Sequence, residues 1–287
     1  MILNLPKILI ITAFKDEAQL KECIKSVKNQ KNVITEHIFI EGLNLLDSQK
    51  RTLYLANKYK NDFDFILKLD ADMILLTPFV LVHMVNFLVK NNLNRVMTKV
   101  FDHYSMHRIV GMHLLKASII PQYTEQRIQF PQPDKWISDI KPTKSYSNLI
   151  AIVDHGKFPT PKQSLRYGFN RGKKLNSLKK GSKLISVFVN LYFLVCFTQR
   201  KQFKLSLLGF LFGLFPESSL FNNINEIDEI LINDLSSYNI AFKINFLLKT
   251  LYLKKIKLNI ITFIIVLINL FLTMIETCFY KLKYKID

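Results

Sequence analysis

The alternation of strand-like and helix-like segments in the first hundred residues limits the possible folds of this chain more than any other feature. Residues 7–12 (KILIIT) form a β-branched run that is typical of a strand buried on both faces. Residues 16–30 then carry apolar side chains at helical spacing. The order repeats, with strand-like segments at 36–41, 63–69 and 95–100 and helix-like segments at 48–61 and 80–90. This β-α-β-α-β order predicts an α/β fold with a mostly parallel sheet flanked by helices.

Beyond residue 120 the pattern changes twice. Residues 121–142 are punctuated by prolines, and a further strand-like segment at 149–153 ends in Asp154-His155-Gly156. The last third is basic and apolar: it holds uncharged runs at 184–197 and 205–215, and Gly209 and Gly213 form a GxxxG spacing that permits close helix packing. We therefore expect an α/β domain over residues 1–172 and a basic, apolar, helical region over residues 173–287.

The charge and hydropathy of the chain point to an anionic membrane surface, an anionic substrate, or both. The 287 residues carry 40 Lys+Arg against 22 Asp+Glu, a net charge of +18, yet the mean hydropathy is +0.14. A nucleic-acid surface would interleave aromatic and basic residues, whereas the basic residues of this chain border apolar segments, so we exclude nucleic acid as a partner. Residues 258–275 are uncharged and flanked by lysines on both sides. That length stands at the threshold for spanning a bilayer, and a helix lying in the membrane interface is an equal alternative.

Asp70-Ala71-Asp72 is the strongest chemical signal, because two carboxylates flank one small residue directly after an apolar strand. At a strand end the alternation of sides breaks into a turn, so both carboxylates can face one site. Hard anionic oxygens suit Mg²⁺ or Mn²⁺, which also draw on phosphate oxygens to complete their coordination. The alternative is a turn that only caps the next helix.

Residues 11–30 read ITAFKDEAQLKECIKSVKNQ and resemble the opening of the family 2 glycosyltransferases. The helical part, LKECIKSVKNQ, matches without gaps, and the turn TAFKD stands where the family prefers PTYNE. Glu41 and Gly42 stand where the family has one or two Asp residues, and Asp70-Ala71-Asp72 falls at the expected interval. The resemblance covers residues 7–80.

This resemblance implies a GT-A fold, which is Rossmann-like, and a metal-dependent transfer of a sugar from a nucleotide-sugar donor to a glycan or lipid-linked acceptor. It implies that Asp16 and Glu41 contact the nucleoside and that Lys50 lies near the diphosphate. For Asp16, helix capping is an equal alternative. It also implies that Asp70, Asp72 and His155 hold Mg²⁺ or Mn²⁺.

The leaving diphosphate and the acceptor need further residues. The side chains of Arg166 and Tyr167, in the basic segment after His155, can clamp a diphosphate or contact lipid headgroups. Family enzymes place an acidic general base in the acceptor region. In this chain Asp139 and Asp134 flank Trp136, which could stack on a sugar. We favour Asp139 slightly, and Glu125 and Asp102 stay open as alternatives.

Family habit and the C-terminal composition together suggest a location at the cytoplasmic face of the inner membrane, held peripherally or by a single C-terminal anchor. The three scattered cysteines indicate neither a disulfide framework nor a zinc site, which fits a reducing compartment. A rival hypothesis is a catalytically inactive GT-A-like assembly protein at the membrane. Glu41-Gly42, in place of paired acids, favours it.

Overall fold

The computed structural model describes residues 5–128, 133–146, 152–177, 191 and 200–214. The chain divides into two compact units, which we describe separately. The first comprises Met1–His103 and Arg108–Phe158, and the second comprises Tyr104–His107 and Pro159–Asp287. Residue 172, where the sequence suggests a domain boundary, lies within helix α5 (Pro161–Ser177).

The first unit is built on a mixed sheet whose strand order is β2-β1-β3-β6-β5-β8-β4, with β7 paired to β5. β1 is parallel to β2 and β3, and β5 is parallel to β7 and β8, whereas β3–β6 and β4–β8 are antiparallel. The α/β prediction is confirmed, and the sheet is mixed. The strands are β1 (Lys7–Phe14), β2 (Ile34–Glu41), β3 (Phe65–Lys68), β4 (Met73–Leu75), β5 (Arg95–Asp102), β6 (His107–Lys116), β7 (Thr143–Tyr146) and β8 (Val153–His155).

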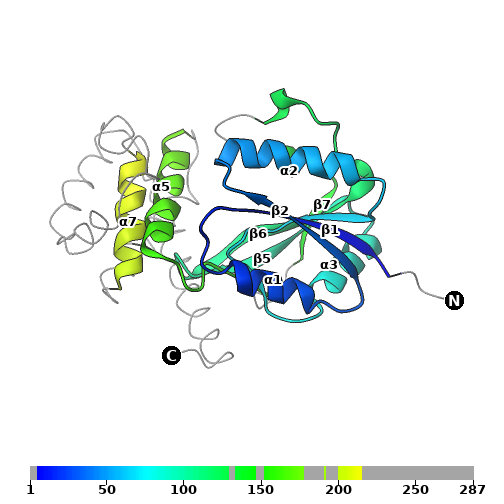
Figure 1. Cartoon of the computed structure of the whole chain (residues 1–287), viewed down its shortest axis with the longest axis horizontal. Coiled ribbons are helices and arrows are strands. Elements are labelled where there is room, and N and C mark those ends of the chain that lie inside the picture. Colours follow the sequence, from blue (N-terminus) through cyan, green and yellow to red (C-terminus); the bar gives the residue numbers. More distant parts are fainter. Residues whose placement is uncertain (1–4, 129–132, 147–151, 178–190, 192–199, 215–287) are drawn as a thin grey trace, which may run out of the picture. The chain divides into compact units, whose positions relative to one another are not determined.

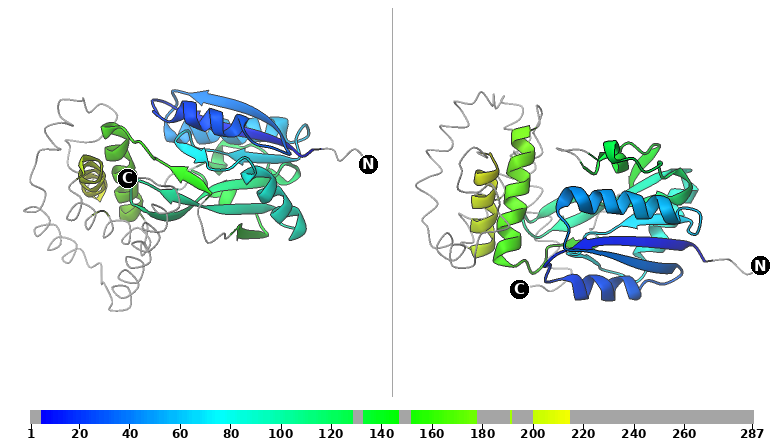
Figure 2. Two further views of the ribbon diagram at one scale, coloured as in Figure 1. Left: turned by 90° about the horizontal axis from the view of Figure 1, so that it is seen from below. Right: turned by 45° about the horizontal axis from the view of Figure 1, so that its top comes forward.

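Helices cover both faces of this sheet. α2 (Leu45–Tyr59) lies along one face, while α1 (Leu20–Lys28) and α3 (Val80–Lys90) lie on the other (Figures 1 and 2). The remaining helical pieces are short: η1 (Ala117–Ile119), η2 (Glu125–Arg127) and α4 (Lys135–Ser138). Asn44 caps α2 by accepting a hydrogen bond from the Asp47 backbone N–H through its side chain, at 3.0 Å.

β1 shows why the opening run predicts a doubly covered strand. Ile8 and Ile10 point into the core beneath α1 and α3, whereas Leu9 and Ile11 point into the core beneath α2. All four side chains are fully buried. Strand β6, which is antiparallel to β3, is not predicted from the sequence, because HRIVGMHLLK breaks the apolar alternation at Gly111 and His113.

The second unit contains a helix pair, α5 and α7 (Lys201–Leu214), which lie side by side (Figure 1). Glycines make this contact possible. A Cβ built on Gly209 would lie 2.0 Å from the backbone oxygen of Leu165, and one on Gly213 would lie 2.2 Å from that of Phe169. From the other helix, a Cβ on Gly168 would lie 1.8 Å from the backbone oxygen of Ser206. The GxxxG spacing therefore marks a close packing face.

Replacing Gly209 by Ala should lower the free energy of unfolding by roughly 1–3 kcal/mol, because the added methyl group forces the two backbones apart. The loss should appear even though Ala is the better helix former by about 1 kcal/mol. Asn170→Ala on the exposed side of α5 is the matched control and should not destabilise the chain. Denaturant unfolding of the full chain measures both. Equal stability of the two variants would contradict this packing.

No helix within the described ranges is both long enough and apolar enough to cross a membrane. The uncharged segment 258–275 lies outside these ranges, and so do most of 184–197 and the end of 205–215.

Candidate active site

The carboxyl ends of three neighbouring parallel strands meet at one edge of the sheet. Phe14 at the end of β1 is in register with Glu41 at the end of β2. Lys68 at the end of β3 is in register with Ile11 of β1, and the Leu69 backbone N–H donates to the Ile11 carbonyl at 3.1 Å. The chain then enters the Asp70–Asp72 turn. In α/β sheets, ligands bind outside such carboxyl ends.

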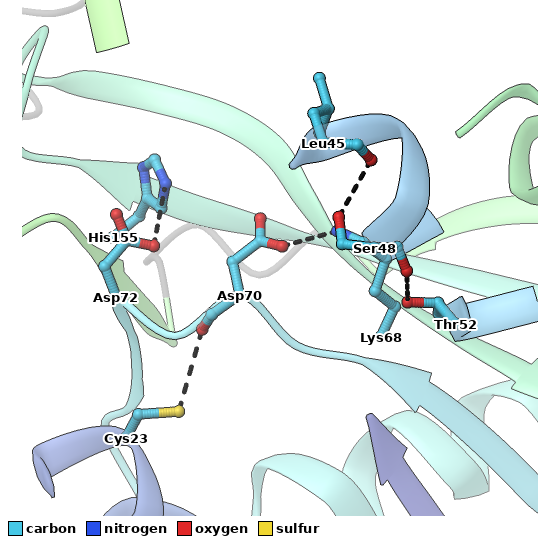
Figure 3. Close-up of polar contacts among 8 residues, drawn as sticks. All are labelled: Cys23, Leu45, Ser48, Thr52, Lys68, Asp70, Asp72 and His155. Atoms are coloured by element: carbon cyan, nitrogen blue, oxygen red, sulfur yellow. Dashed lines mark hydrogen bonds and ion pairs between the residues drawn. The ribbon is translucent and has the colours of Figure 1, made fainter. Parts of the chain in front are cut away.

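The Asp70–Asp72 turn presents two carboxylates to the same side (Figure 3). The turn is closed by the Met73 backbone N–H, which donates to the Asp70 carbonyl at 3.0 Å. The Asp70 side chain is 44% exposed and that of Asp72 is 13% exposed. Beneath the turn, the Cys23 thiol donates to the Asp70 carbonyl at 3.8 Å. Burial raises the pKa of the Cys23 thiol to about 12, and the charges of Asp72 and Asp70 add to the effect. The thiol is therefore protonated and inert.

Asp72 is linked to His155 and, through it, to Asp102. β8 lies between β4 and β5, which places His155 opposite Met73 on one side and Asp102 on the other. The His155 Nδ1 lies 2.7 Å from Asp102 Oδ1, and its Nε2 lies 3.4 Å from Asp72 Oδ1. Burial lowers the pKa of His155, but Asp72 and Asp102 outweigh burial and raise the pKa to about 9. In the metal-free protein the imidazolium therefore bridges two carboxylates.

Asp70 has a different partner, Lys68, which the sequence reasoning did not assign to the site. The Lys68 Nζ donates to Asp70 Oδ1 at 2.6 Å. Burial raises the pKa of Asp70, but the charge and hydrogen bond of Lys68 outweigh it, so the net shift is downward. For Lys68, burial lowers the pKa, and the Asp70 carboxylate reverses the effect and raises it. The lysine directly precedes the motif on β3, and only the fold shows that its side chain turns back to Asp70.

Asp134 reaches the neighbourhood of Lys68 because α4 packs on the α2 face of the sheet. The buried Arg95 guanidinium anchors this short helix by donating to the Ile137 carbonyl at 2.8 Å. The Asp134 carboxylate adds to the rise in the pKa of Lys68 and opposes the fall in the pKa of His113, so its charge acts on residues beside the Asp70 turn.

Asp139, the other acid that flanks Trp136, has a partner at the surface. Both oxygens of Asp139 accept from the Lys135 Nζ, at 2.8 and 2.7 Å, and this pair is solvent-exposed. Trp136, considered as a sugar platform, is only 3% exposed and packs in the core beneath α2. Its apolar surface fixes α4 to the sheet, which the sequence alone did not reveal.

The open alternatives for the base have partners of their own. Asp102 is fully buried against His155, so it is shielded from an acceptor hydroxyl. Glu125 lies 3.9 Å from the Nζ of Lys50, the residue expected near a diphosphate.

The N-cap of α1 is Gln19, so Asp16 does not cap this helix and stands exposed after β1. Glu41 is also exposed, at the end of β2.

Arg166 and Tyr167 belong to α5 in the second unit, and their surroundings are described within it. The Tyr167 ring stacks on that of Tyr104 at 4.4 Å between centroids, and the two ring planes differ by 7°. Its hydroxyl lies 3.2 Å from the Ser105 Oγ, and the Arg171 guanidinium lies 5.1 Å from its ring centroid. Tyr167 is thus built into an aromatic and cationic cluster of that unit.

The chemistry of the donor set fits a Mg²⁺ or Mn²⁺ ion that is completed by ligand oxygens. Within the described part of the chain, no three or more His, Cys, Asp or Glu side chains form a ready cluster for a metal ion. Mg²⁺ is usually held by one or two carboxylates together with phosphates and water, and Asp70 and Asp72 are the two carboxylates of this turn. Asp102 fixes the Nδ1 side of His155, which leaves Nε2 directed at Asp72, an orientation found in metal-binding histidines.

His37, in the middle of β2, gives a pH-dependent expectation. Its Nε2 lies 2.8 Å from the Thr12 Oγ1, and burial lowers its pKa to about 4. In the unfolded chain a histidine titrates near about 6.5, so the unfolded state binds the extra proton as the pH falls from 6.5 to 4. Stability from neutral His37 is therefore present above pH 6.5 and lost below it. His37→Gln should make the acid loss smaller by roughly 1–2 kcal/mol, measured by denaturant unfolding at pH 7 and pH 4.5.

Comparison with known proteins gives partial structural likenesses. No protein-family model and no curated protein matches the chain. A mannosyltransferase from Pyrobaculum calidifontis, solved with GDP-mannose and Mn²⁺, is 11% identical with a TM-score of 0.41, over 75% of this chain and 82% of that one. A glycosyltransferase involved in the glycosylation of the major capsid of PBCV-1 is 10% identical with a TM-score of 0.38, over 54% of this chain and 95% of that one.

A third solved structure is a cytidylyltransferase from Leptospira borgpetersenii. It is 16% identical with a TM-score of 0.35, over 63% of this chain and 92% of that one. At these identities and TM-scores, the function of this chain has to be inferred from its own strand ends, carboxylates and cations.

Proposed function

We propose that this chain is a metal-dependent glycosyltransferase of the GT-A type, which moves a sugar from a nucleotide-sugar donor to a hydroxyl of a glycan or lipid-linked acceptor. One observation carries the proposal. Two carboxylates, Asp70 and Asp72, stand on one turn at the carboxyl edge of three parallel strands, and His155 is directed at the second of them. Side chains of the kind that bind divalent cations thus lie at the edge where ligands of α/β sheets bind, which supports the proposal.

In this proposal the donor lies across the ends of β1, β2 and β3. Glu41 and Asp16 accept hydrogen bonds from the nucleoside, and Lys50 lies on α2 toward the diphosphate. Asp70 and Asp72, with His155, hold Mg²⁺ or Mn²⁺. The bound ion supplies charge neutralisation for the departing nucleotide. For Arg166 and Tyr167, binding of a diphosphate or of lipid headgroups stays a prediction from the sequence.

Asp134 is the general base in this proposal, in preference to Asp139. It takes the proton of the acceptor hydroxyl as that oxygen attacks the anomeric carbon of the sugar, and the bond to the nucleotide breaks. The support is electrostatic: the Asp134 carboxylate acts on Lys68 and His113, whereas Asp139 is paired with Lys135.

The direct test is a screen of nucleotide-sugars with the purified full chain. Release of the nucleoside diphosphate, by hydrolysis or transfer, should require Mg²⁺ or Mn²⁺ and should stop when EDTA is added. Turnover unaffected by EDTA would contradict the metal-dependent proposal. If no nucleotide-sugar is turned over and no nucleoside diphosphate binds in the presence of Mn²⁺, the result would contradict the enzyme proposal and favour the rival hypothesis of an inactive assembly protein.

We further propose that the enzyme works at the cytoplasmic face of the inner membrane. The support is the composition of the last third, where lysines flank the uncharged segment 258–275. Binding to liposomes that contain anionic lipids should weaken as salt is raised if the attachment is peripheral. Binding that resists high salt and carbonate would instead indicate an anchor, and absence of binding would contradict the location.

A further inference from the structure

Lys68 holds an oxygen that the proposed metal ion needs. We propose that Lys68 is an internal counter-ion for Asp70: it competes with the divalent cation for this carboxylate and, once the cation is bound, its ammonium turns to the diphosphate of the ligand. The inference rests on the proposed function and adds a residue to it. Lys68 then lowers the affinity for the cation when no nucleotide is present, and it binds the diphosphate of the metal-nucleotide complex.

The geometry shows how closely the lysine is engaged. The Lys68 Nζ lies 2.6 Å from the Asp70 Oδ1, and the lysine side chain is 19% exposed. It is the last residue of β3, opposite His113 of β6, on the sheet face that α2 and α4 cover. Burial lowers the pKa of His113 to about 4, with Arg95 and Lys68 acting in the same direction, so at neutral pH this neighbour adds no positive charge.

A divalent cation and an ammonium cannot share this carboxylate at no cost. A metal–oxygen bond to Asp70 would bring two positive charges within a few ångströms of each other in a partly buried site, where like charges repel more strongly than in water. The lysine has a flexible four-carbon stem, so the ammonium can leave Asp70 while the backbone of β3 stays in place.

The destination of the ammonium follows from the charges around it. Besides Asp70, the carboxylates of Asp134 and Asp72 act on Lys68 from the neighbouring turn and helix. When a cation neutralises the Asp70–Asp72 turn, two anions are left for Lys68 in this proposal: the single Asp134 carboxylate and the more highly charged diphosphate that completes the metal coordination. Lysine binds phosphate as a mobile point charge, with three hydrogen-bond donors.

Two titrations of the full, metal-free chain test this inference. The first is calorimetric titration with Mn²⁺ alone, where Lys68→Met should bind about tenfold more tightly than the wild type, because the competing cation is gone. The second is titration with inorganic pyrophosphate at saturating Mn²⁺, where Lys68→Met should bind about tenfold more weakly. Lys68→Arg should stay near the wild type in both, and Lys90→Met at the exposed end of α3 is the matched control.

The opposite signs separate the inference from a merely structural role, which would weaken both affinities. Lys68→Gln is the second neutral variant if the Met variant does not fold. If Mn²⁺ binding depends on Asp72 but the neutral variants bind Mn²⁺ no more tightly than the wild type, the role of Lys68 is overturned and the proposed function stands. Absence of Mn²⁺ binding in the wild type and in both neutral variants would overturn the proposed function and this inference with it.

Discussion

Replacing Asp72 by Asn should lower kcat/KM for the nucleotide-sugar by about a hundredfold to a thousandfold, which is the range of loss in turnover when one strong electrostatic contact to the reacting group is removed. The substitution keeps the size of the side chain and removes its charge. Asp72 is the more enclosed carboxylate of the turn, and His155 is directed at it. An amide there binds a divalent cation more weakly, so the departing diphosphate loses its counter-charge.

The control is Asp62→Asn. Asp62 is exposed and precedes β3, so it stands at the opposite end of that strand from the Asp70–Asp72 turn. This variant should keep wild-type turnover. Mn²⁺ titration and thermal unfolding of both variants separate loss of the site from loss of the fold. Wild-type turnover by Asp72→Asn would end the metal-dependent model.

The parts of the fold that local sequence determines were predictable. The run at residues 7–12 lies in a strand buried on both faces, and residues 80–90 form α3 with the predicted bounds. Here the apolar period alone is informative, because each segment buries one face or both faces against the same core. The Asp70–Asp72 pair was also readable, because a strand followed by two acids is a local pattern.

The interactions that give this site its charge balance were not predictable. The pairing of His155 with Asp102 joins residues 53 positions apart and depends on the register of β5 and β8. Nothing in the sequence near either residue signals that register. Similarly, Arg95 reaches Ile137 of α4 only because the proline-rich segment packs on the sheet, which also buries Trp136. The loop-like composition of residues 121–142 does not indicate that packing.

The preference between two acids in one short segment shows what the structure adds. Both acids flank Trp136, and from the sequence Asp139 is only slightly favoured over Asp134. In the structure Asp139 and Lys135 form a pair one helical turn apart at the surface, of the kind that contributes little. Asp134 precedes α4 and makes no side-chain capping hydrogen bond to it. Its substitution therefore removes no helix cap, which makes it a clean test.

Asp134→Asn should lower kcat by about a hundredfold or more, the contribution typical of a positioned general base, with little change in KM for the donor. Asp139→Asn should stay within about threefold of the wild type, because only an exposed pair is lost. The pH profile of kcat gives an independent readout: the acid limb should disappear in Asp134→Asn and persist in Asp139→Asn. The reverse ranking of the two variants would move the base to Asp139. Equal and full activity of both would show that the acceptor hydroxyl loses its proton to another group at this edge of the sheet.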